Sequence, residues 1–311
     1  MFSETIAEQL SVNGFEVVAT RPVDDAPDDA TSLVLINGLG AGPKHWGPVL
    51  EKLAQRRPVY AVEAVSQDDD GLMSTSADNV VGIADALGLE EFYLGGQSWG
   101  SLAAQKAAIR HERRVKKLFL VATAPGTPVV PPRYSALMAI SSDKRNLDDA
   151  GKIFGGEVTR IMQDDPGDLS PEDQVTRSLI TELMNREIDP RKVRNQQRKA
   201  LNNSRSGWFN LIGLAGLVDT PTLIVAGDQD PLTRPFNARA MKAIMPNTEL
   251  HIEEGVGHDV ILSRADSVAA RANIFFDSEP EPVSVATAAL GLWLRSASNF
   301  ADVAVQMLPG L

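Results

Sequence analysis

The sequence predicts an α/β fold in which a mainly parallel sheet has helices on both faces and carries an inserted helical cap. Short, fully apolar runs alternate along the chain with segments whose apolar residues recur at helical spacing. Such runs are typical of parallel strands that are buried on both faces. Between the strands expected at 118–122 and 222–226 lie about a hundred residues without a strand pattern, although a parallel crossover needs only a dozen or more. The excess predicts the cap.

The composition is that of a globular protein: 311 residues with 43% hydrophobic content, four His and no Cys. The absence of Cys excludes disulfides, thiolate metal sites and a cysteine nucleophile. A net charge of −11 argues against nucleic acid or an anionic membrane as the main partner. The start of the chain lacks the pattern of a secretory signal, and no apolar stretch approaches the ~20 residues of a membrane-spanning helix. We therefore expect a cytoplasmic protein.

The elements follow from these apolar patterns in chain order. Strands are expected at 15–19, 33–36, 59–62, 91–94, 118–122, 222–226 and 249–252. Helical spacing covers 46–55, 77–87 and 101–109 and resumes at 263; the second of these helices ends at Gly88. We assign residues 1–124 and 221–281 to the core, 125–220 to the helical cap and 282–311 to an apolar helical tail.

The segment Gly96-Gln97-Ser98-Trp99-Gly100 stands between an expected strand and an expected helix. Its two glycines allow a strand to turn sharply into a helix, which leaves the Ser98 hydroxyl projecting from the corner. The five-residue pattern is short and occurs by chance, so the strand before it and the helix after it are what favour Ser98 as a nucleophile over a serine in an ordinary turn.

A serine nucleophile needs a histidine base, which in turn needs an orienting carboxylate. His45 follows a glycine-rich loop, His111 lies in a charged helix end, and His251 alternates within a strand. His258 lies in a glycine-flanked loop just past a strand, where sheets of this kind present catalytic groups. We predict by elimination that His258 is the base.

Two carboxylates, Asp228 and Asp230, directly follow the strand at 222–226. Both stand at the carboxyl end of a parallel strand, where Ser98 and His258 are also expected. The residues alone do not decide which of the two carboxylates orients His258. Either one gives the chain order serine, aspartate, histidine, which distinguishes one class of serine triad from the others.

The glycine-rich loop at 37–43 suits a different task, the binding of an oxyanion by backbone N–H groups. We expect the N–H groups of Leu39 and Trp99 to form that pair. A dinucleotide fingerprint would need glycine where Pro43 stands, and a phosphate-binding loop would need Gly-Lys-Ser/Thr, whereas the chain continues Pro43-Lys44-His45. No His, Asp and Glu cluster has metal-ligand spacing, so neither a metal nor another cofactor is expected.

With these parts in place, residues 13–277 resemble an α/β hydrolase, and the chain is most similar to intracellular poly(3-hydroxyalkanoate) depolymerases. The likeness lies in Ser98-Trp99-Gly100 and in the segments 117–124, 220–232, 250–252, 257–258 and 263–266. The superfamily pattern Gly-x-x-Asp falls on Asp230, so the resemblance favours Asp230 over Asp228. It implies a carboxylic ester hydrolase that acts through Ser98, Asp230 and His258 on a polyhydroxyalkanoate or its oligomers.

One segment departs from the pattern of these relatives. After the strand corresponding to 59–62 they usually carry Asp-x-Pro-Gly-x-Gly-x-Ser, whereas residues 63–71 here read Glu-Ala-Val-Ser-Gln-Asp-Asp-Asp-Gly. Because this segment borders the site in the family, we expect an altered substrate shape or specificity.

The cap and the tail are both rich in apolar residues. We expect Met138, Trp208 and Phe209 to line the entrance for an acyl substrate; the alternative is that they only pack the cap onto the core. Three roles stay open for the tail at 282–311: a helix packed on the core, a contact in a homo-oligomer, or a helix that docks on a lipid or granule surface.

Two other functions also stay open, a small-molecule carboxylesterase or lipase and a non-catalytic binding protein with a hydrolase fold. A hydrophobic ester or polyester is the expected partner, and nucleic acid is not.

Overall fold

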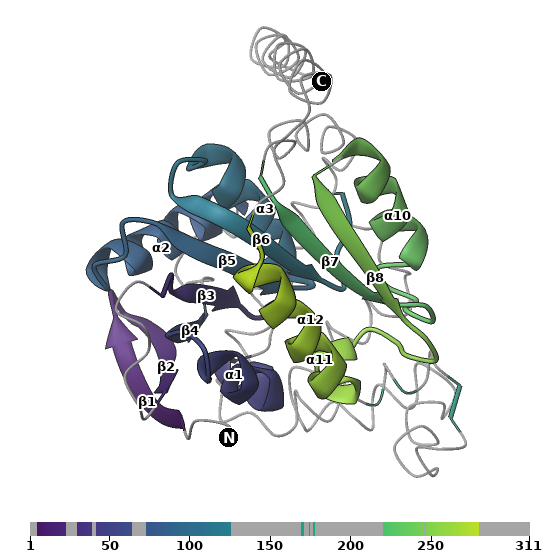
Figure 1. Ribbon diagram of the computed structural model, residues 1–311, viewed down its shortest axis with the longest axis horizontal. Coiled ribbons are helices and arrows are strands. Elements are labelled where there is room, and N and C mark those ends of the chain that lie inside the picture. Colours follow the sequence, from purple (N-terminus) through teal and green to yellow (C-terminus); the bar gives the residue numbers. More distant parts are fainter. Residues whose placement is uncertain are drawn as a thin grey trace, which may run out of the picture.

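The computed structural model describes residues 5–22, 30–38, 42–63, 73–125, 169–170, 174, 177, 220–245 and 247–279. Within these residues an eight-stranded sheet runs through the centre, in the order β1-β2-β4-β3-β5-β6-β7-β8 (Figure 1). The strands are β1 (Thr5–Val12), β2 (Phe15–Pro22), β3 (Leu33–Ile36), β4 (Val59–Val62), β5 (Phe92–Gln97), β6 (Val115–Val121), β7 (Thr222–Gly227) and β8 (Thr248–Glu253). β2 pairs antiparallel with β1 and with β4, and all other pairs are parallel.

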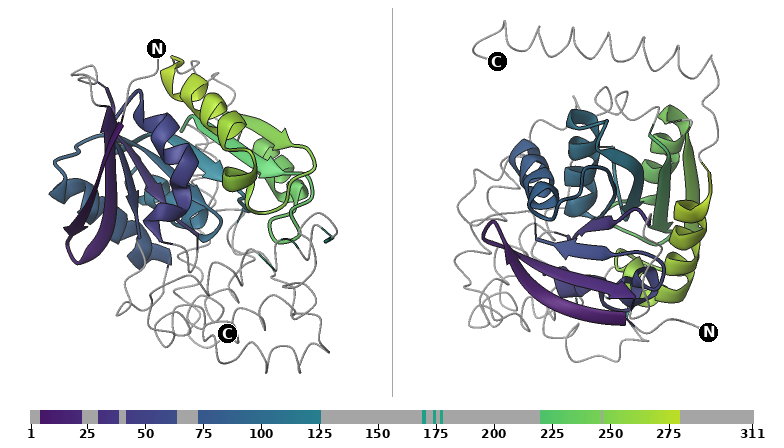
Figure 2. Two further views of the ribbon diagram at one scale, coloured as in Figure 1. Left: turned by 90° about the horizontal axis from the view of Figure 1, so that it is seen from below. Right: turned by 60° about the vertical axis from the view of Figure 1, so that its left-hand side comes forward.

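Helices cover both faces of this sheet (Figure 2). One face carries α2 (Met73–Ala86), α3 (Trp99–Arg110) and α10 (Pro235–Ile244). The other carries the 3-10 helix η1 (Pro43–Trp46), α1 (Gly47–Ala54), α11 (Val260–Ser263) and α12 (Ala265–Asp277). The predicted architecture, a mainly parallel sheet with helices on both faces, is therefore confirmed.

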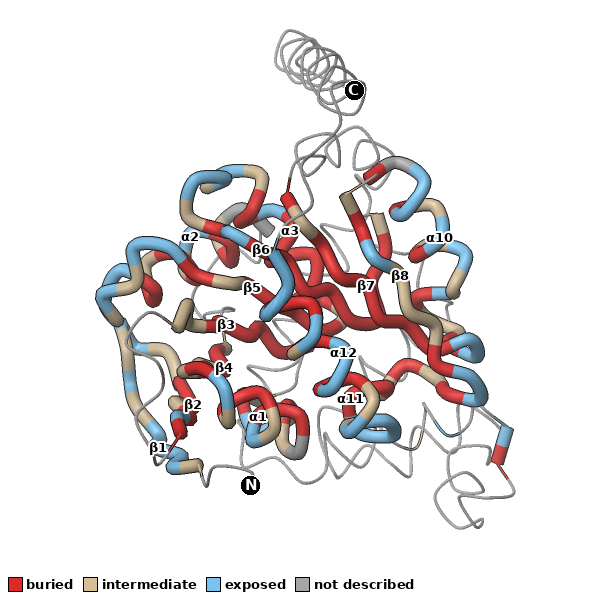
Figure 3. The backbone as a smooth tube through the Cα atoms, in the orientation of Figure 1, coloured by how far each residue is buried: buried red, intermediate tan, exposed pale blue. Residues whose placement is uncertain are grey.

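The alternation of side chains along the strands divides the core into two layers. In β6, Leu118 and Leu120 pack in the layer with α2 and α3, whereas Phe119 and Val121 pack in the layer with α1 and α12. All four are fully buried, and the central strands are buried along most of their length (Figure 3). Since burial of one such side chain contributes roughly 1.5–3 kcal/mol, these strands form a rigid base for the loops at their ends.

Strand β1 and helix α10 are not among the elements expected from the sequence. β1 exposes most of its side chains, so it lacks the apolar pattern by which the other strands are found. Asn13 and Gly14, with φ angles of 52° and 82°, form the two-residue turn between β1 and β2, and positive φ at both positions is typical of a type I′ hairpin. That Asn-Gly pair, and Pro235 in the first turn of α10, are the signals from which both elements could have been predicted.

The carboxyl ends of the parallel strands lie along one edge of the sheet. Ser98 directly follows β5, Asp230 follows β7 by three residues, and His258 follows β8 by five. Nearly all of the predicted cap at 125–220, and the whole tail at 282–311, lie outside the described residues.

Candidate active site

Ser98 occupies the turn between β5 and α3. Its φ of 53° and ψ of −119° lie outside the helical and extended regions, a conformation that costs a non-glycine residue about 1–3 kcal/mol. The following backbone passes very close to the end of β3, because a Cβ at Gly100 would lie 2.3 Å from the carbonyl oxygen of Ile36. A Cβ at Gly96 would lie 2.2 Å from the carbonyl oxygen of Gly100. Both glycines of the motif are therefore required by close backbone contacts, as the sequence pattern suggested.

Three side chains from separate loops form one hydrogen-bonded row, which we call the Ser98–His258–Asp230 row. Oγ of Ser98 lies 2.8 Å from Nε2 of His258, and Nδ1 of His258 lies 2.8 Å from Oδ2 of Asp230. His258 is 4% exposed and Asp230 is 2% exposed. A hydroxyl that donates to an imidazole, itself bonded to a buried carboxylate, is an arrangement suited to activating a serine nucleophile.

Of the two candidate carboxylates, the structure brings Asp230 to His258. Asp228 is exposed, and its Oδ1 lies 3.3 Å from the backbone nitrogen of Val256. The acid loop and the histidine loop touch where β7 ends, since a Cβ at Gly227 would lie 2.2 Å from the carbonyl oxygen of Val256. A glycine at this position therefore allows the two loops to approach until Asp230 reaches His258.

The Asp230 carboxylate accepts hydrogen bonds at both of its oxygens. The backbone N–H groups of Leu232 and Thr233 donate to Oδ1 over 2.8 and 2.9 Å, and the Thr233 hydroxyl donates to Oδ2. Burial alone raises the pKa of this carboxyl, but the charge of His258 and the hydrogen bonds from His258 and Thr233 outweigh burial and hold the pKa below its ordinary value. Asp230 is therefore ionised at neutral pH.

Two of the other histidines pair with carboxylates outside this row. Nε2 of His111 lies 3.2 Å from Asp78, and Nε2 of His251 lies 2.9 Å from Glu253. His45 lies in η1. The elimination made from the sequence and the arrangement of the described residues thus lead to the same histidine, His258.

A second polar cluster lies behind Ser98 and was not predicted. Nε2 of Gln105 donates to Oγ1 of Thr123 over 2.9 Å, Oγ1 of Thr123 lies 2.7 Å from Oγ of Ser101, and the Ser101 hydroxyl donates to the carbonyl oxygen of Ser98 over 2.5 Å. All three side chains are buried. Together they hold the backbone of Ser98 from the side of α3 and the end of β6. Two polar residues four positions apart on an alanine-rich helix are the sequence signal that could have revealed them.

Several predicted site residues lie outside the described residues, namely Leu39, Met138, Trp208, Phe209 and positions 64–71. Trp99, the other predicted oxyanion donor, is the first residue of α3 and is 7% exposed. The first N–H groups of a helix have no acceptor within it, and the oxyanion role of the Trp99 N–H stays a prediction.

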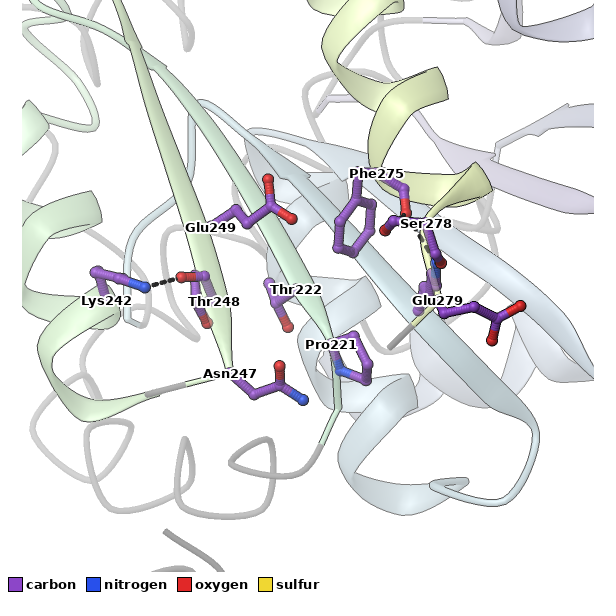
Figure 4. Close-up of a pocket in the computed structure, with 10 residues that line it drawn as sticks. Pro221, Thr222, Lys242, Asn247, Thr248, Glu249, Phe275, Ser278 and Glu279 are labelled. Atoms are coloured by element: carbon purple, nitrogen blue, oxygen red, sulfur yellow. Dashed lines mark hydrogen bonds between the residues drawn. The ribbon is translucent and has the colours of Figure 1, made fainter. Parts of the chain in front are cut away.

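A pocket of about 380 Å³ lies at the opposite edge of the sheet, where β7 and β8 begin (Figure 4). Its lining includes Lys117, Lys242 and Glu249 but no member of the Ser98–His258–Asp230 row. Lys117 is 3% exposed, and its ammonium donates to the carbonyl oxygens of Phe275, Phe276 and Ser278 at the end of α12. Lys117 therefore stabilises the carboxyl end of α12. The pocket is separate from the candidate active site.

The part of the chain that the structure describes contains neither a metal-binding cluster nor a membrane-spanning helix. No group of three or more His, Asp and Glu side chains there is arranged to hold a metal ion. No helix among the described residues has the length and apolar character needed to cross a membrane.

A family model described as "Alpha/beta hydrolase family" matches residues 33–271, which include Ser98, Asp230 and His258. The chain belongs to the alpha/beta hydrolase family. The match covers most of the described sheet. It confirms the resemblance to α/β hydrolases that the sequence motifs indicated.

A depolymerase and two hydrolases match most of this chain. The poly(3-hydroxyalkanoate) depolymerase of Ectopseudomonas oleovorans is 27% identical over 266 residues, which cover 77% of this chain and 82% of that protein. The 2-hydroxy-6-oxononadienedioate/2-hydroxy-6-oxononatrienedioate hydrolase 2 of Pseudomonas putida is 24% identical over 253 residues, 76% of this chain and 84% of that protein. Among solved structures, the 2-hydroxy-6-oxo-6-phenylhexa-2,4-dienoate hydrolase of Rhodococcus sp. strain RHA1 has a TM-score of 0.66 at 17% identity, covering 89% of this chain and 100% of that one. This last likeness supports the fold alone.

Proposed function

We propose that this alpha/beta hydrolase cleaves carboxylic esters with an apolar acyl part through a serine nucleophile, and that its substrate is a polyhydroxyalkanoate or its oligomers. The observation that carries the proposal is the Ser98–His258–Asp230 row, with 2.8 Å at each of its two contacts. The poly(3-hydroxyalkanoate) depolymerase among the relatives supports the substrate class.

In the first half of the reaction, Oγ of Ser98 attacks the carbonyl carbon of the ester while Nε2 of His258 takes the hydroxyl proton. The Asp230 carboxylate stabilises the imidazolium that forms. When the tetrahedral intermediate collapses, the bond to the alcohol oxygen breaks and His258 returns the proton to that oxygen. The alcohol leaves, and the acyl group stays on Ser98.

In the second half, water attacks the acyl-enzyme and gives a proton to His258. Collapse of the second tetrahedral intermediate breaks the bond to Oγ, and the proton returns to Ser98 as the carboxylic acid departs. The oxyanion of both intermediates is bound by the N–H groups of Trp99 and Leu39 in this proposal. One such donor contributes about 3–4 kcal/mol of transition-state stabilisation.

The first test is the hydrolysis of p-nitrophenyl esters with acyl chains of two to twelve carbons. The wild type should be active, with a rate that rises with chain length, and Ser98→Ala should lose at least about 10³-fold because the nucleophile is gone. Ser76→Ala is the matched control, since Ser76 is a fully buried serine of α2 that lies outside the row. It should retain wild-type activity.

The outcomes separate the candidate functions. Activity on long-chain esters that extends to polyhydroxyalkanoate granules supports the proposal, whereas activity restricted to short, soluble esters favours a small-molecule carboxylesterase. A folded protein that hydrolyses no ester, and whose Ser98 is not labelled by a fluorophosphonate probe, would instead favour a non-catalytic binding protein.

A further inference from the structure

Thr233 adds a fourth polar group beside the Ser98–His258–Asp230 row. It is 4% exposed and donates twice to the same carboxylate, with its N–H 2.9 Å from Oδ1 and its hydroxyl oxygen 2.6 Å from Oδ2 of Asp230. The backbone and the side chain of Thr233 thus contact different oxygens. A substitution can therefore remove the bond to Oδ2 and leave the bond to Oδ1 in place.

The direction of the Thr233 hydroxyl proton follows from its neighbours. An ionised carboxylate only accepts, so the hydroxyl donates to Oδ2 of Asp230. The lone pairs of the hydroxyl oxygen then remain for His258, whose Nδ1 lies 3.4 Å from that oxygen and 2.8 Å from Oδ2. Both oxygens beside Nδ1 are acceptors.

An imidazole nitrogen between two acceptors has to carry a proton. Neutral His258 is then protonated at Nδ1 and unprotonated at Nε2, the nitrogen that lies 2.8 Å from Oγ of Ser98. In the opposite tautomer, the lone pair of Nδ1 would face a carboxylate oxygen and the lone pairs of a hydroxyl, which is repulsive.

We propose that Thr233 is a positioning residue that holds His258 in the Nδ1-protonated tautomer with its ring directed at Ser98, an inference that rests on the proposed serine mechanism. Thr233 acts through Asp230 and through its contact with Nδ1 of His258, and it touches no reacting atom. Without the hydroxyl, the carboxylate keeps two backbone donors at Oδ1 but only the imidazole at Oδ2. The carboxylate group then has more freedom to rotate, and the imidazole follows it.

The test compares three variants of the full chain. Thr233→Val removes the hydroxyl, keeps nearly the same shape and retains the backbone N–H, while Thr233→Ser restores a hydroxyl. Thr20→Val is the matched control, because Thr20 is 1% exposed and its hydroxyl has no hydrogen-bond partner in the described part of the chain. Each variant is measured by steady-state hydrolysis of a p-nitrophenyl ester and by the low-field proton resonance of the His258 Nδ1–H.

A hydrogen bond to a charged group contributes enough to change a rate by about ten- to a hundredfold. Thr233→Val should therefore lose about that factor in kcat with little change in KM, and its Nδ1–H resonance should move upfield or broaden. Thr233→Ser should recover most of kcat and the resonance. Thr20→Val should match the wild type in both.

Two results would overturn the assignment. One is a Thr233→Val enzyme with wild-type kcat and an unchanged Nδ1–H resonance; the other is a loss that Thr233→Ser does not restore. Failure of the proposed function is seen separately, as a wild type that hydrolyses no ester and is not labelled at Ser98. The Nδ1–H resonance still reports on Thr233 in that event.

Discussion

Asp230 keeps a negative charge in a buried place because His258 and the loop of Asp230 itself surround the charge with donors. It is 2% exposed, yet Leu232, Thr233 and His258 together give its two oxygens four hydrogen bonds. A carboxylate offers about four lone-pair sites, so the donors match its accepting capacity. A buried carboxylate without such donors would be protonated and could not support an imidazolium.

The lowered pKa of Asp230 predicts a pH-dependent contribution to stability. A carboxyl whose folded pKa lies below its unfolded value, near 4, stabilises the fold fully above that value, and this stability is lost as pH falls through the folded pKa. The difference in unfolding free energy between wild type and Asp230→Asn should therefore shrink between pH 5 and pH 2. Urea denaturation at several pH values measures this difference.

The control for this measurement is Asp266→Asn, which alters a side chain that is 90% exposed and pairs with Lys52. The difference in unfolding free energy between Asp266→Asn and the wild type should stay small from pH 5 to pH 2. A wild-type advantage over Asp230→Asn that is equal at pH 5 and pH 2 would contradict the prediction.

Gly100 shows how one residue without a side chain permits the turn at Ser98. An alanine there would place its Cβ 2.3 Å from a backbone carbonyl of β3, which no rotamer change relieves. We expect Gly100→Ala to lower the free energy of unfolding by about 1–3 kcal/mol or more and to abolish ester hydrolysis. Thermal unfolding and the p-nitrophenyl assay measure both effects.

Gly82 in α2 provides the opposite case. The nearest atom to a Cβ there would be 4.0 Å away, on Asn13, so an alanine fits without strain. Gly82→Ala should raise stability by about 0.5–1 kcal/mol, because glycine in a helix loses more backbone entropy on folding than alanine does. If Gly100→Ala and Gly82→Ala changed the free energy of unfolding in the same direction, the close contact at Gly100 would not explain the effect of its substitution.

At the scale of elements, α12 is attached to the sheet by its carboxyl end. Lys117 of β6 donates to the carbonyls of Phe275, Phe276 and Ser278, which the helix leaves without intrahelical donors. Burial, together with the charge of Arg57, holds the pKa of the Lys117 ammonium below its usual value. Arg57 adds a second attachment, since it forms an ion pair with Asp277 and lies over the ring of Phe276.

We expect Lys117→Met to lower the free energy of unfolding by about 2 kcal/mol, because three helix-end carbonyls lose their buried donor. Lys116→Met is the control on the same strand: Lys116 is 49% exposed, and its ion pair with Glu91 contributes at most about 1 kcal/mol. Chemical denaturation of both variants makes the comparison. Equal losses would show that the helix-end contact contributes nothing beyond a surface charge.

At the scale of the whole molecule, the candidate site could be predicted because the fold is mainly parallel. Parallel strands end at one edge, so residues that follow β5, β7 and β8 meet there even though the sequence gives no contact between them. The sheet and the candidates Ser98, Asp230 and His258 follow from this rule. Asp228 and Asp230 could not be separated by it, because both satisfy it and only the resemblance favoured one of them.

What the sequence did not predict depends on side-chain partners that are distant in the chain. In the sequence, Thr233 and Ser101 are ordinary polar residues of a loop and a helix. Only the contact of Thr233 with Asp230 and that of Ser101 with the Ser98 carbonyl distinguish them from other polar residues. Strand β1 was missed for a related reason. Its partner β2 and its two-residue turn define it, whereas its own side chains are mostly exposed.

The separation of the row's members along the chain has a consequence for how the protein is made. Ser98 and His258 are 160 positions apart, and Asp230 and His258 are 28 apart. The turn at Ser98 is built from β3, β5, α3 and the end of β6, so it leaves the ribosome long before His258. The chain therefore passes through synthesis with a serine that has no histidine beside it. In the proposed serine mechanism, hydrolysis needs the residues that follow β7 and β8, so its onset would mark one of the last steps of folding.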